Sequence, residues 1–282
     1  MAGTGPYENE GIWDSAAPGW AKWERALMGG AAGATDRMLD AARVKPGMQV
    51  LDLACGAGSQ TIHAARRVGP SGRVLANDIA SKMLAFVAAN AAAAGLTNIE
   101  TLHGPAESLA ESGLRVDAAV CRLGLMLFRS PRDALAAMRT VLARNGRFAC
   151  LVFAAPQENP LFSKTMAIAL KHAGKTPPAA SSPGLFALSD PARLQTLFEA
   201  AGYTGIAIER VTVRLSIASP DDALTMMQEA FGAYRAVLAG LDADSRAAAW
   251  REIRDCLETF SSPGGVAAEM VLLLASGENP AG

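Results

Sequence analysis

This chain of 282 residues contains few cysteines and few histidines, and its positive and negative charges nearly cancel. The four cysteines are scattered and form no Cys-x-x-Cys pair, which argues against a zinc site and against a disulfide framework. A formal net charge of −1 gives no general attraction to nucleic acid or to an anionic membrane. We therefore expect a protein of the reducing cytoplasm that does not take nucleic acid as a partner.

Long apolar runs are also lacking. The stretch Leu84–Leu96 is apolar and rich in alanine, but it is too short to span a bilayer and contains Asn90. The first residues of the chain have no basic region followed by an apolar run, so we do not expect a secretory signal there. The sequence therefore predicts no membrane insertion.

The most informative stretch that is present is Val50–Gly58, an apolar run that contains one acid and ends in a Gly-x-Gly turn. Its apolar residues are typical of a buried parallel strand, and Gly56 and Gly58 can take positive φ and let a ligand lie against the backbone. A helix is predicted directly afterwards over Gln60–Val68. A second strand then leads to Asp78, twenty residues after Gly58, where such folds place an acid under a ribose.

Two ligand classes fit this pattern, dinucleotides and S-adenosylmethionine. Asp52 favours the second, because a carboxylate at the end of the first strand would repel a pyrophosphate but suits an ammonium group. The third glycine of the dinucleotide fingerprint is also missing, since Gly58 is followed by Ser59, Gln60 and Thr61. A nicotinamide-dependent oxidoreductase is therefore the disfavoured alternative.

The chain resembles the class I S-adenosylmethionine-dependent methyltransferases, in particular the branch of ubiquinone/menaquinone-type C-methyltransferases and small-molecule methyltransferases. The resemblance is good from Val44 to Pro156 and looser elsewhere. It implies S-adenosyl-L-methionine as the cofactor and an α/β fold with a doubly wound, mostly parallel seven-stranded sheet. The stretches that carry the resemblance are Val50–Gly58, Asn77–Leu84, Gly104–Leu109, Asp117–Phe128 and Val141–Phe148.

The alternation of strand and helix patterns supports such a sheet and divides the chain. The predicted strands are Gln49–Leu53, Arg73–Ala76, Ile99–His103, Ala118–Arg122, Arg147–Phe153, Tyr203–Ile217 and Ala267–Ala275. We expect an N-terminal helical segment over the cofactor site (1–40), a cofactor-binding core (41–156, continued in 189–218), two helical lid insertions (157–188 and 219–262), and a last strand with a tail (263–282). The insertions alternatively mediate homodimerisation.

The resemblance also implies roles for single residues. On the methionine side, Asp52 and the carbonyl of Ala54 are expected to hold the ammonium group, and Arg122 to lie near by. Asp78 is expected to accept hydrogen bonds from both ribose hydroxyls. The remaining expected cofactor contacts are Trp20, Gly56, Ala57, Gly58, Ile79, Met83, Ala106, Glu107, Leu123 and Gly124.

Some of these assignments have ordinary structural alternatives. Met83 can be a helix-core residue, Arg122 can form a structural ion pair, and the helix with Trp20 can simply pack on the core. The family commonly has Asp where this chain has Pro105, which leaves Glu107 or water to bind the adenine amino group.

The reaction implied is in-line displacement at the sulfonium methyl, for which alignment is the main requirement. The insertions are rich in Leu, Met, Phe and Ala, which favours a small, partly apolar acceptor. A general base would help an oxygen acceptor, and His172 in the first insertion is the best-placed histidine. Acids are not clustered after the late strands, so no metal is expected. A quinone-biosynthesis C-methyltransferase and a non-catalytic S-adenosylmethionine-binding protein remain as alternatives.

Overall fold

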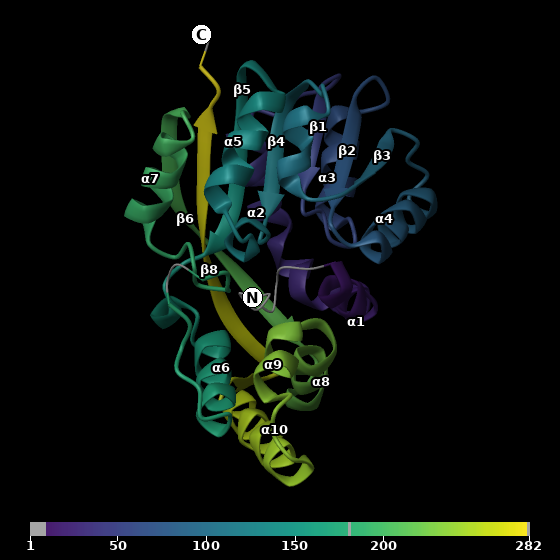
Figure 1. The fold of residues 1–282 in the computed structure, drawn as a ribbon. Helices are drawn as coiled ribbons and strands as arrows, with labels where there is room; N and C mark the ends of the chain where they lie inside the picture. Colours follow the sequence, from purple (N-terminus) through teal and green to yellow (C-terminus); the bar gives the residue numbers. More distant parts are fainter. Residues whose placement is uncertain (1–9, 180–181, 281–282) are drawn as a thin grey trace.

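Strands and helices alternate through the first half of the chain in the computed structural model, which describes residues 10–179 and 182–280 (Figure 1). The strands of this half are β1 (Gln49–Leu53), β2 (Arg73–Asp78), β3 (Ile99–His103), β4 (Val116–Arg122) and β5 (Leu142–Phe153). Its helices are α1 (Glu10–Met28), η1 (Gly29–Ala31), α2 (Ala32–Ala41), α3 (Ser59–Val68), α4 (Ser81–Ala93), η2 (Ala106–Glu111), η3 (Leu125–Leu127) and α5 (Pro131–Val141).

The second half is richer in helices. It contains η4 (Pro156–Glu158), α6 (Pro160–His172), α7 (Pro191–Ala200), β6 (Thr204–Ile217), α8 (Pro220–Ala230), α9 (Gly232–Leu238), α10 (Ala243–Glu258), β7 (Ser261–Ser262) and β8 (Gly265–Glu278). Helices α5, α7 and α8 begin alike, with a Ser or Asp whose side chain accepts a backbone N–H and a proline next to it. The predicted helix start at Asp190 is thereby confirmed.

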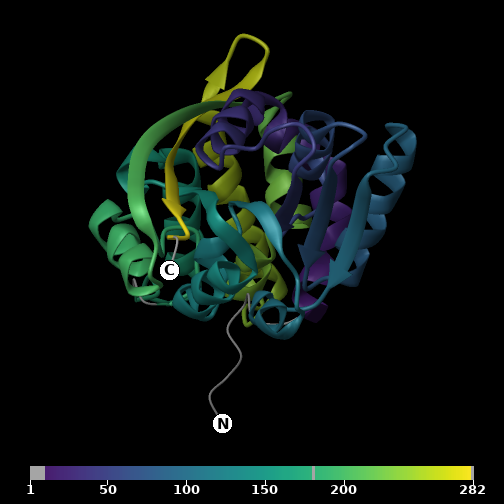
Figure 2. The same ribbon diagram turned by 90° about the horizontal axis from the view of Figure 1, so that it is seen from above.

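One sheet runs through the molecule in the order β3-β2-β1-β4-β5-β8-β6. The pairs from β3 to β5 are parallel, whereas β8 lies antiparallel between β5 and β6. The expected doubly wound sheet is confirmed, but it has eight strands instead of seven, because β7 also pairs with β8. This added strand of two residues forms a hairpin that projects from the protein (Figure 2), and it is too short to leave a sequence pattern.

The observed strands are longer than predicted where a neighbour supplies hydrogen bonds. Strand β2 continues through Asp78 because β3 pairs with it up to His103. Strand β5 begins at Leu142 instead of Arg147, because Leu142 pairs with Val116 of β4. The apolar pattern of the sequence stops at the last apolar residue of a strand. The hydrogen bonding between strands continues for as long as a neighbouring strand is present.

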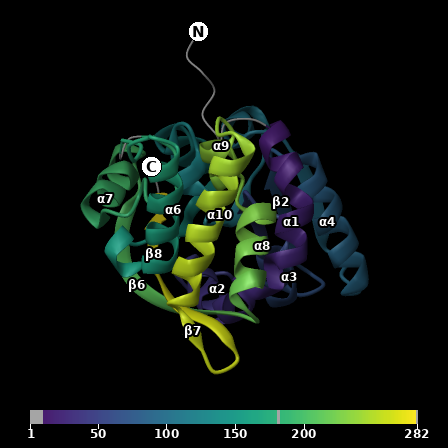
Figure 3. The ribbon, with the colours of Figure 1, turned by 90° about the horizontal axis from the view of Figure 1, so that it is seen from below.

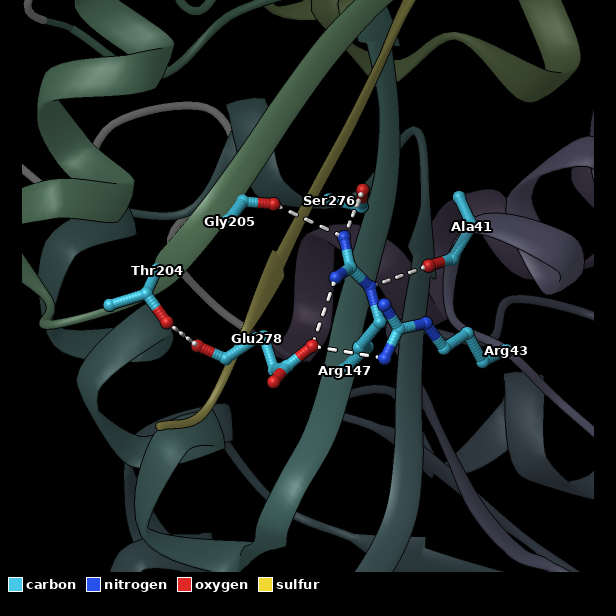
Figure 4. A network of polar contacts seen from close by, with 7 residues as sticks. All are labelled: Ala41, Arg43, Arg147, Thr204, Gly205, Ser276 and Glu278. Atoms are coloured by element: carbon cyan, nitrogen blue, oxygen red, sulfur yellow. Dashed lines mark hydrogen bonds and ion pairs between the residues drawn. The ribbon is translucent and has the colours of Figure 1, made fainter. Parts of the chain in front are cut away.

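A buried arginine ties together the end of the sheet opposite the Gly-x-Gly turn (Figure 4). Arg147 donates hydrogen bonds to the carbonyl of Ala41 (3.0 Å) and to Ser276 Oγ (3.0 Å), and it pairs with Glu278 at 3.3 Å. Glu278 also pairs with Arg43 at 3.0 Å. These contacts join the end of α2 to β5 and β8.

Both insertions leave the sheet at the edge that carries the Gly-x-Gly turn. Strand β6 runs in the same direction as β5, because both are antiparallel to β8, so α6 and α8 follow the same edge. Figure 3 shows α6, α10, α8, α1 and α4 side by side across this edge, and neighbours in this row contact one another. In the described part of the chain, no helix is both long and apolar enough to cross a membrane.

Candidate active site

The strand order reverses between β1 and β4, and the turns that follow these two strands touch. Ala54 and Leu123, one residue after each strand, both have positive φ, of 51° and 60°. A Cβ on Gly124 would lie only 2.6 Å from the Cβ of Ala54, so glycine is required there. Backbone strain on both strands at a topological switch point is typical of a ligand crevice.

The Gly-x-Gly turn is left-handed at both glycines, with φ of 58° at Gly56 and 97° at Gly58. A Cβ on Gly58 would lie 3.1 Å from the side chain of Val87 in α4, so this glycine allows the turn to pack on α4. Gly56 faces Trp20, whose Nε1 would lie 3.2 Å from an added Cβ. Ala57 is buried, whereas Ala54 and Gly56 keep partial exposure. The predicted turn is thus present, with Trp20 against it.

Asp52 is completely buried beneath this turn. Its two carboxylate oxygens accept hydrogen bonds from Gln60 Nε2 (2.7 Å) and from Thr61 Oγ1 (2.6 Å) of α3. Burial raises the pKa of Asp52 from 3.8 to about 6, although these two hydrogen bonds and Arg122 act in the opposite direction. Asp52 therefore anchors α3 to β1, and a direct contact with an ammonium group stays a prediction.

The raised pKa of Asp52 predicts a pH dependence of stability. The folded protein binds this proton more tightly than the unfolded chain, so the associated stability is present below pH 3.8 and is lost as the pH rises through about 6. We expect Asp52→Asn to become more stable relative to wild type by roughly 2 kcal/mol between about pH 4.5 and about pH 7.5. Urea unfolding at both pH values measures this difference, and identical pH dependences of the two proteins would contradict it.

Asp78 ends β2 beside the turn and is 8% exposed. Its Oδ2 accepts a hydrogen bond from the backbone N–H of Gly56 (3.0 Å), and its Oδ1 accepts one from that of Ala80 (2.9 Å). Burial raises the pKa of Asp78, while the backbone N–H groups lower it. The backbone N–H of Ile79 is a third group that lowers this pKa. Because a carboxylate has about four acceptor sites, Asp78 can still accept a hydrogen bond from a ligand.

The residues expected around the adenine lie directly after β2, in the first turn of α4 and at the start of η2. Ile79 is partly exposed and its carbonyl contacts His103 Nε2 at 3.0 Å, whereas Met83 is buried against α1. Ala106 is buried, and Glu107 is exposed. Pro105 precedes η2, and no hydrogen bond of the Glu107 side chain is present within the described residues, so this carboxylate is available to a ligand.

Arg122 ends β4 and is buried, 9% exposed. Its Nη1 donates to Thr35 Oγ1 (2.8 Å), and its Nη2 donates to Ser59 Oγ. Burial lowers the pKa of this guanidinium, while the nearby Glu24 and Asp52 raise it. The alternative expectation of a structural ion pair is not met, because Arg122 forms no ion pair within 4.0 Å among the residues described.

Helix α1 covers this edge between α4 and α8 (Figure 3). On the side of α4, Asp14 Oδ1 accepts a hydrogen bond from the backbone N–H of Lys82 in the first turn of that helix (2.9 Å). On the other side, Trp23 Nε1 donates to Glu229 of α8 (2.6 Å), and a Cβ on Gly19 would lie 2.3 Å from the Glu229 carbonyl oxygen. The N-terminal helix is therefore held on both flanks of the Gly-x-Gly turn.

Aromatic rings connect the turn to the first insertion. Trp20 contacts Phe231 edge-on at 5.9 Å between ring centroids, Phe231 contacts Phe162 at 5.6 Å, and Phe162 contacts Phe153 at the end of β5 at 5.3 Å. A row of aromatic rings thus runs from the Gly-x-Gly turn to the end of β5.

His172 is the last residue of α6, and its Nε2 lies 2.7 Å from Glu252 of α10. Among the described residues, His172 makes no contact with the residues of the Gly-x-Gly turn. Its role as a base therefore stays a prediction. Within residues 10–179 and 182–280, no group of His, Cys, Asp and Glu side chains is arranged to hold a metal ion.

Three polar residues of this region were not recognised from the sequence. Gln60 and Thr61 stand where a dinucleotide fingerprint continues to its third glycine, and they are the donors to Asp52. Glu24 is buried, and its Oε1 accepts the backbone N–H of Ser59 (3.1 Å). The signal for Glu24 was its spacing of four from Trp20, which places both side chains on one helix face.

A family model described as a methyltransferase domain matches residues 44–202, more than half of the chain. The chain belongs to the S-adenosylmethionine-dependent methyltransferases. The demethylmenaquinone methyltransferase of Bacillus cytotoxicus is 30% identical to this methyltransferase over 193 residues, which cover 63% of this chain and 78% of that protein. The nocamycin O-methyltransferase of Saccharothrix syringae is 33% identical over 111 residues, 39% of this chain and 40% of the relative. The chain thus matches less than half of this second relative.

Solved structures agree on the fold of this methyltransferase. The YcgJ protein from Bacillus subtilis has a TM-score of 0.58 at 20% identity, with 89% of this chain and 99% of that chain covered. The [4+2]-cyclase SpnF has a TM-score of 0.53 at 17% identity, with 89% and 81% covered. The second likeness shows that the acceptor chemistry must be argued from the site and not from the fold.

Proposed function

We propose that this methyltransferase transfers the methyl group of S-adenosylmethionine to a small, partly apolar organic acceptor by in-line displacement. The observation that carries the proposal is the carboxylate of Asp78 next to the partly exposed backbone of Ala54 and Gly56, under helices whose inner side chains are aromatic. The cofactor supplies an activated methyl group. The protein aligns it with the acceptor and excludes water, and alignment can contribute roughly 7–11 kcal/mol to lowering the barrier.

The residues present fit this cofactor. The free lone pairs of Asp78 suit the ribose hydroxyls, and the carbonyl of Ala54, turned by its positive φ, suits the ammonium group. Ile79 and Met83 on one side and Ala106 and Glu107 on the other fall where the adenine is expected. Gly56 presents bare backbone to the ligand, which a side chain would obstruct.

The insertion helices are proposed as a lid over the acceptor. They stand on the same edge as the turn, and they bring apolar rings such as Phe162 and Phe231 towards Trp20. A homodimer formed through the same helices is the alternative role. We also infer a cytoplasmic setting, which the four free cysteines support, three of them buried.

A screen with the methyl-labelled cofactor tests the proposal. The acceptor panel contains apolar quinols and phenols, because one relative is named a demethylmenaquinone methyltransferase and another an O-methyltransferase. We expect label transfer to at least one apolar ring compound and none to glycine or histamine, which are equally small but polar. Cofactor binding without transfer to any acceptor would favour the non-catalytic alternative.

His172 enters the proposal as the candidate general base for an oxygen acceptor. With an acceptor found by the screen, its loss in His172→Gln is expected to lower kcat by about 10²- to 10⁴-fold, with the Kd for S-adenosylhomocysteine unchanged. Lys171→Gln is the matched control, because Lys171 Nζ also contacts Glu252 (3.1 Å) but carries no imidazole. An unchanged kcat in His172→Gln would show that His172 is not the general base and that it only contacts Glu252.

A further inference from the structure

Two side chains of opposite charge are buried on either side of Ser59, in the first turn of α3. Glu24 of α1 accepts the backbone N–H of Ser59 (3.1 Å) with its Oε1, and Arg122 of β4 donates from Nη2 to the Ser59 hydroxyl. Each of the two residues is only 9% exposed. Ser59 directly follows the Gly-x-Gly turn, so both charges lie next to the expected position of the ligand.

Neither charge is neutralised by direct contact in the described part of the chain. The hydrogen bond from Ser59 engages only Oε1 of Glu24, and the partners of Arg122 are the neutral hydroxyls of Thr35 and Ser59. Glu24 and Asp52 act on Arg122 only across space, without an ion pair within 4.0 Å among the described residues. Burying a charge is costly unless a close partner of opposite sign is present, so a ligand that carries both charges would stabilise this pair.

Asp52 and Glu24 differ in how far they are open to a ligand. Asp52 lies deeper than Glu24 and has no exposed surface, and its two oxygens are held by Gln60 and Thr61 of α3. Glu24, by contrast, lies on the same face of α1 as Trp20, which packs on Gly56. Both oxygens of Asp52 and of Asp78 accept hydrogen bonds, whereas Oε2 of Glu24 accepts none within the described residues.

The amino-acid end of S-adenosylmethionine carries an ammonium and a carboxylate, which complement this pair. We propose that Glu24 accepts a hydrogen bond from the cofactor ammonium and that Arg122 donates to the cofactor carboxylate, an inference that rests on the proposed function. Both residues bind the cofactor and orient it without touching the methyl group. Since Glu24 belongs to α1, binding of the amino-acid end also holds α1 over the site.

Calorimetric titrations with three probes test this assignment. S-adenosylhomocysteine carries both charged groups, decarboxylated S-adenosylmethionine lacks the carboxylate, and 5′-methylthioadenosine lacks the whole amino-acid end. We expect Glu24→Gln to weaken the first two at least about tenfold and to leave methylthioadenosine unchanged. We expect Arg122→Gln to weaken only S-adenosylhomocysteine, by a similar factor.

Two further variants serve as controls. Arg122→Lys keeps the buried charge, and we expect an intermediate loss of S-adenosylhomocysteine affinity, because lysine cannot form the planar two-pronged contact of arginine. Lys22→Gln changes an exposed residue of the same helix, whose contact is Glu229, and should leave the affinities for all three probes unchanged.

The outcomes separate this inference from the proposed function. Suppose that wild type binds S-adenosylhomocysteine and methylthioadenosine. If the Glu24 and Arg122 variants then lose affinity for the two probes equally, or for neither probe, the charge assignment is wrong while the cofactor site stands. If wild type binds none of the three probes, the proposed function is wrong as well. Probe-selective losses in both variants support the assignment.

Discussion

Asp78→Ala should weaken the binding of S-adenosylhomocysteine at least about 100-fold, because it removes an ionised acceptor for two ribose hydroxyls. The substitution also removes the acceptor of two backbone hydrogen bonds. In the wild-type protein, the N–H groups of Gly56 and Ala80 donate to Asp78 at 3.0 and 2.9 Å. Both effects act on the same turn, so this substitution is expected to be the most damaging single change for the cofactor. Isothermal titration measures the Kd, and circular dichroism verifies that the variant folds.

Two controls sharpen this experiment. Asp117→Ala also removes a carboxylate that accepts a backbone N–H, that of Gln49 at 2.8 Å, but at the opposite end of β1, so its Kd should equal that of wild type. Asp78→Asn keeps the shape and one acceptor oxygen, and its loss should be intermediate. Binding by Asp78→Ala within about threefold of wild type, far below the loss expected for two charge-assisted hydrogen bonds, would contradict the ribose assignment.

Gly124→Ala should damage both stability and cofactor binding. Its φ of −97° suits any residue, so the effect comes from space alone. The new Cβ would lie 2.6 Å from the Cβ of Ala54 and 3.0 Å from Cys121 Sγ, and the turns after β1 and β4 must separate. We expect a loss of roughly 1–3 kcal/mol in the free energy of unfolding and a weaker affinity for S-adenosylhomocysteine.

Gly33→Ala is the matched control for this substitution. Gly33 lies in α2, and a Cβ there would meet nothing within 4 Å. The same added methyl group should leave the Kd unchanged and raise the free energy of unfolding by up to about 1 kcal/mol, because alanine favours a helix more than glycine does. Urea unfolding compares the two variants. A Gly124→Ala protein as stable and as tight-binding as Gly33→Ala would show that the two turns tolerate separation.

The sequence predicted those parts of the fold whose signal is local. Strand β1, its acid and the Gly-x-Gly turn lie within ten residues, and the apolar pattern, the glycines and the helix that follows all indicate the same structure. The ends of strands were less predictable, because β2, β5 and β8 continue as far as their neighbours pair with them. The two residues of β7 carried no pattern at all.

The site divides in the same way. Asp78 and the glycines follow from spacing along adjacent elements, whereas the partner of Ser59 is Glu24, 35 residues away on a helix whose docking no local pattern specifies. Gln60 and Thr61 were visible in the sequence only as a departure from the dinucleotide fingerprint, and their function as donors to Asp52 required the geometry. His172 meets Glu252 across 80 residues, which spacing could not predict.

A calorimetric titration of the wild-type protein with S-adenosylhomocysteine and, separately, with NADH tests the cofactor assignment most directly. The site places the carboxylates of Asp52 and Asp78 beside the turn, which suits a cationic cofactor and repels a pyrophosphate. We expect micromolar binding of S-adenosylhomocysteine, on the order of −8 kcal/mol, and no binding of NADH. Binding of NADH but not of S-adenosylhomocysteine would contradict the assignment of S-adenosylmethionine as the cofactor.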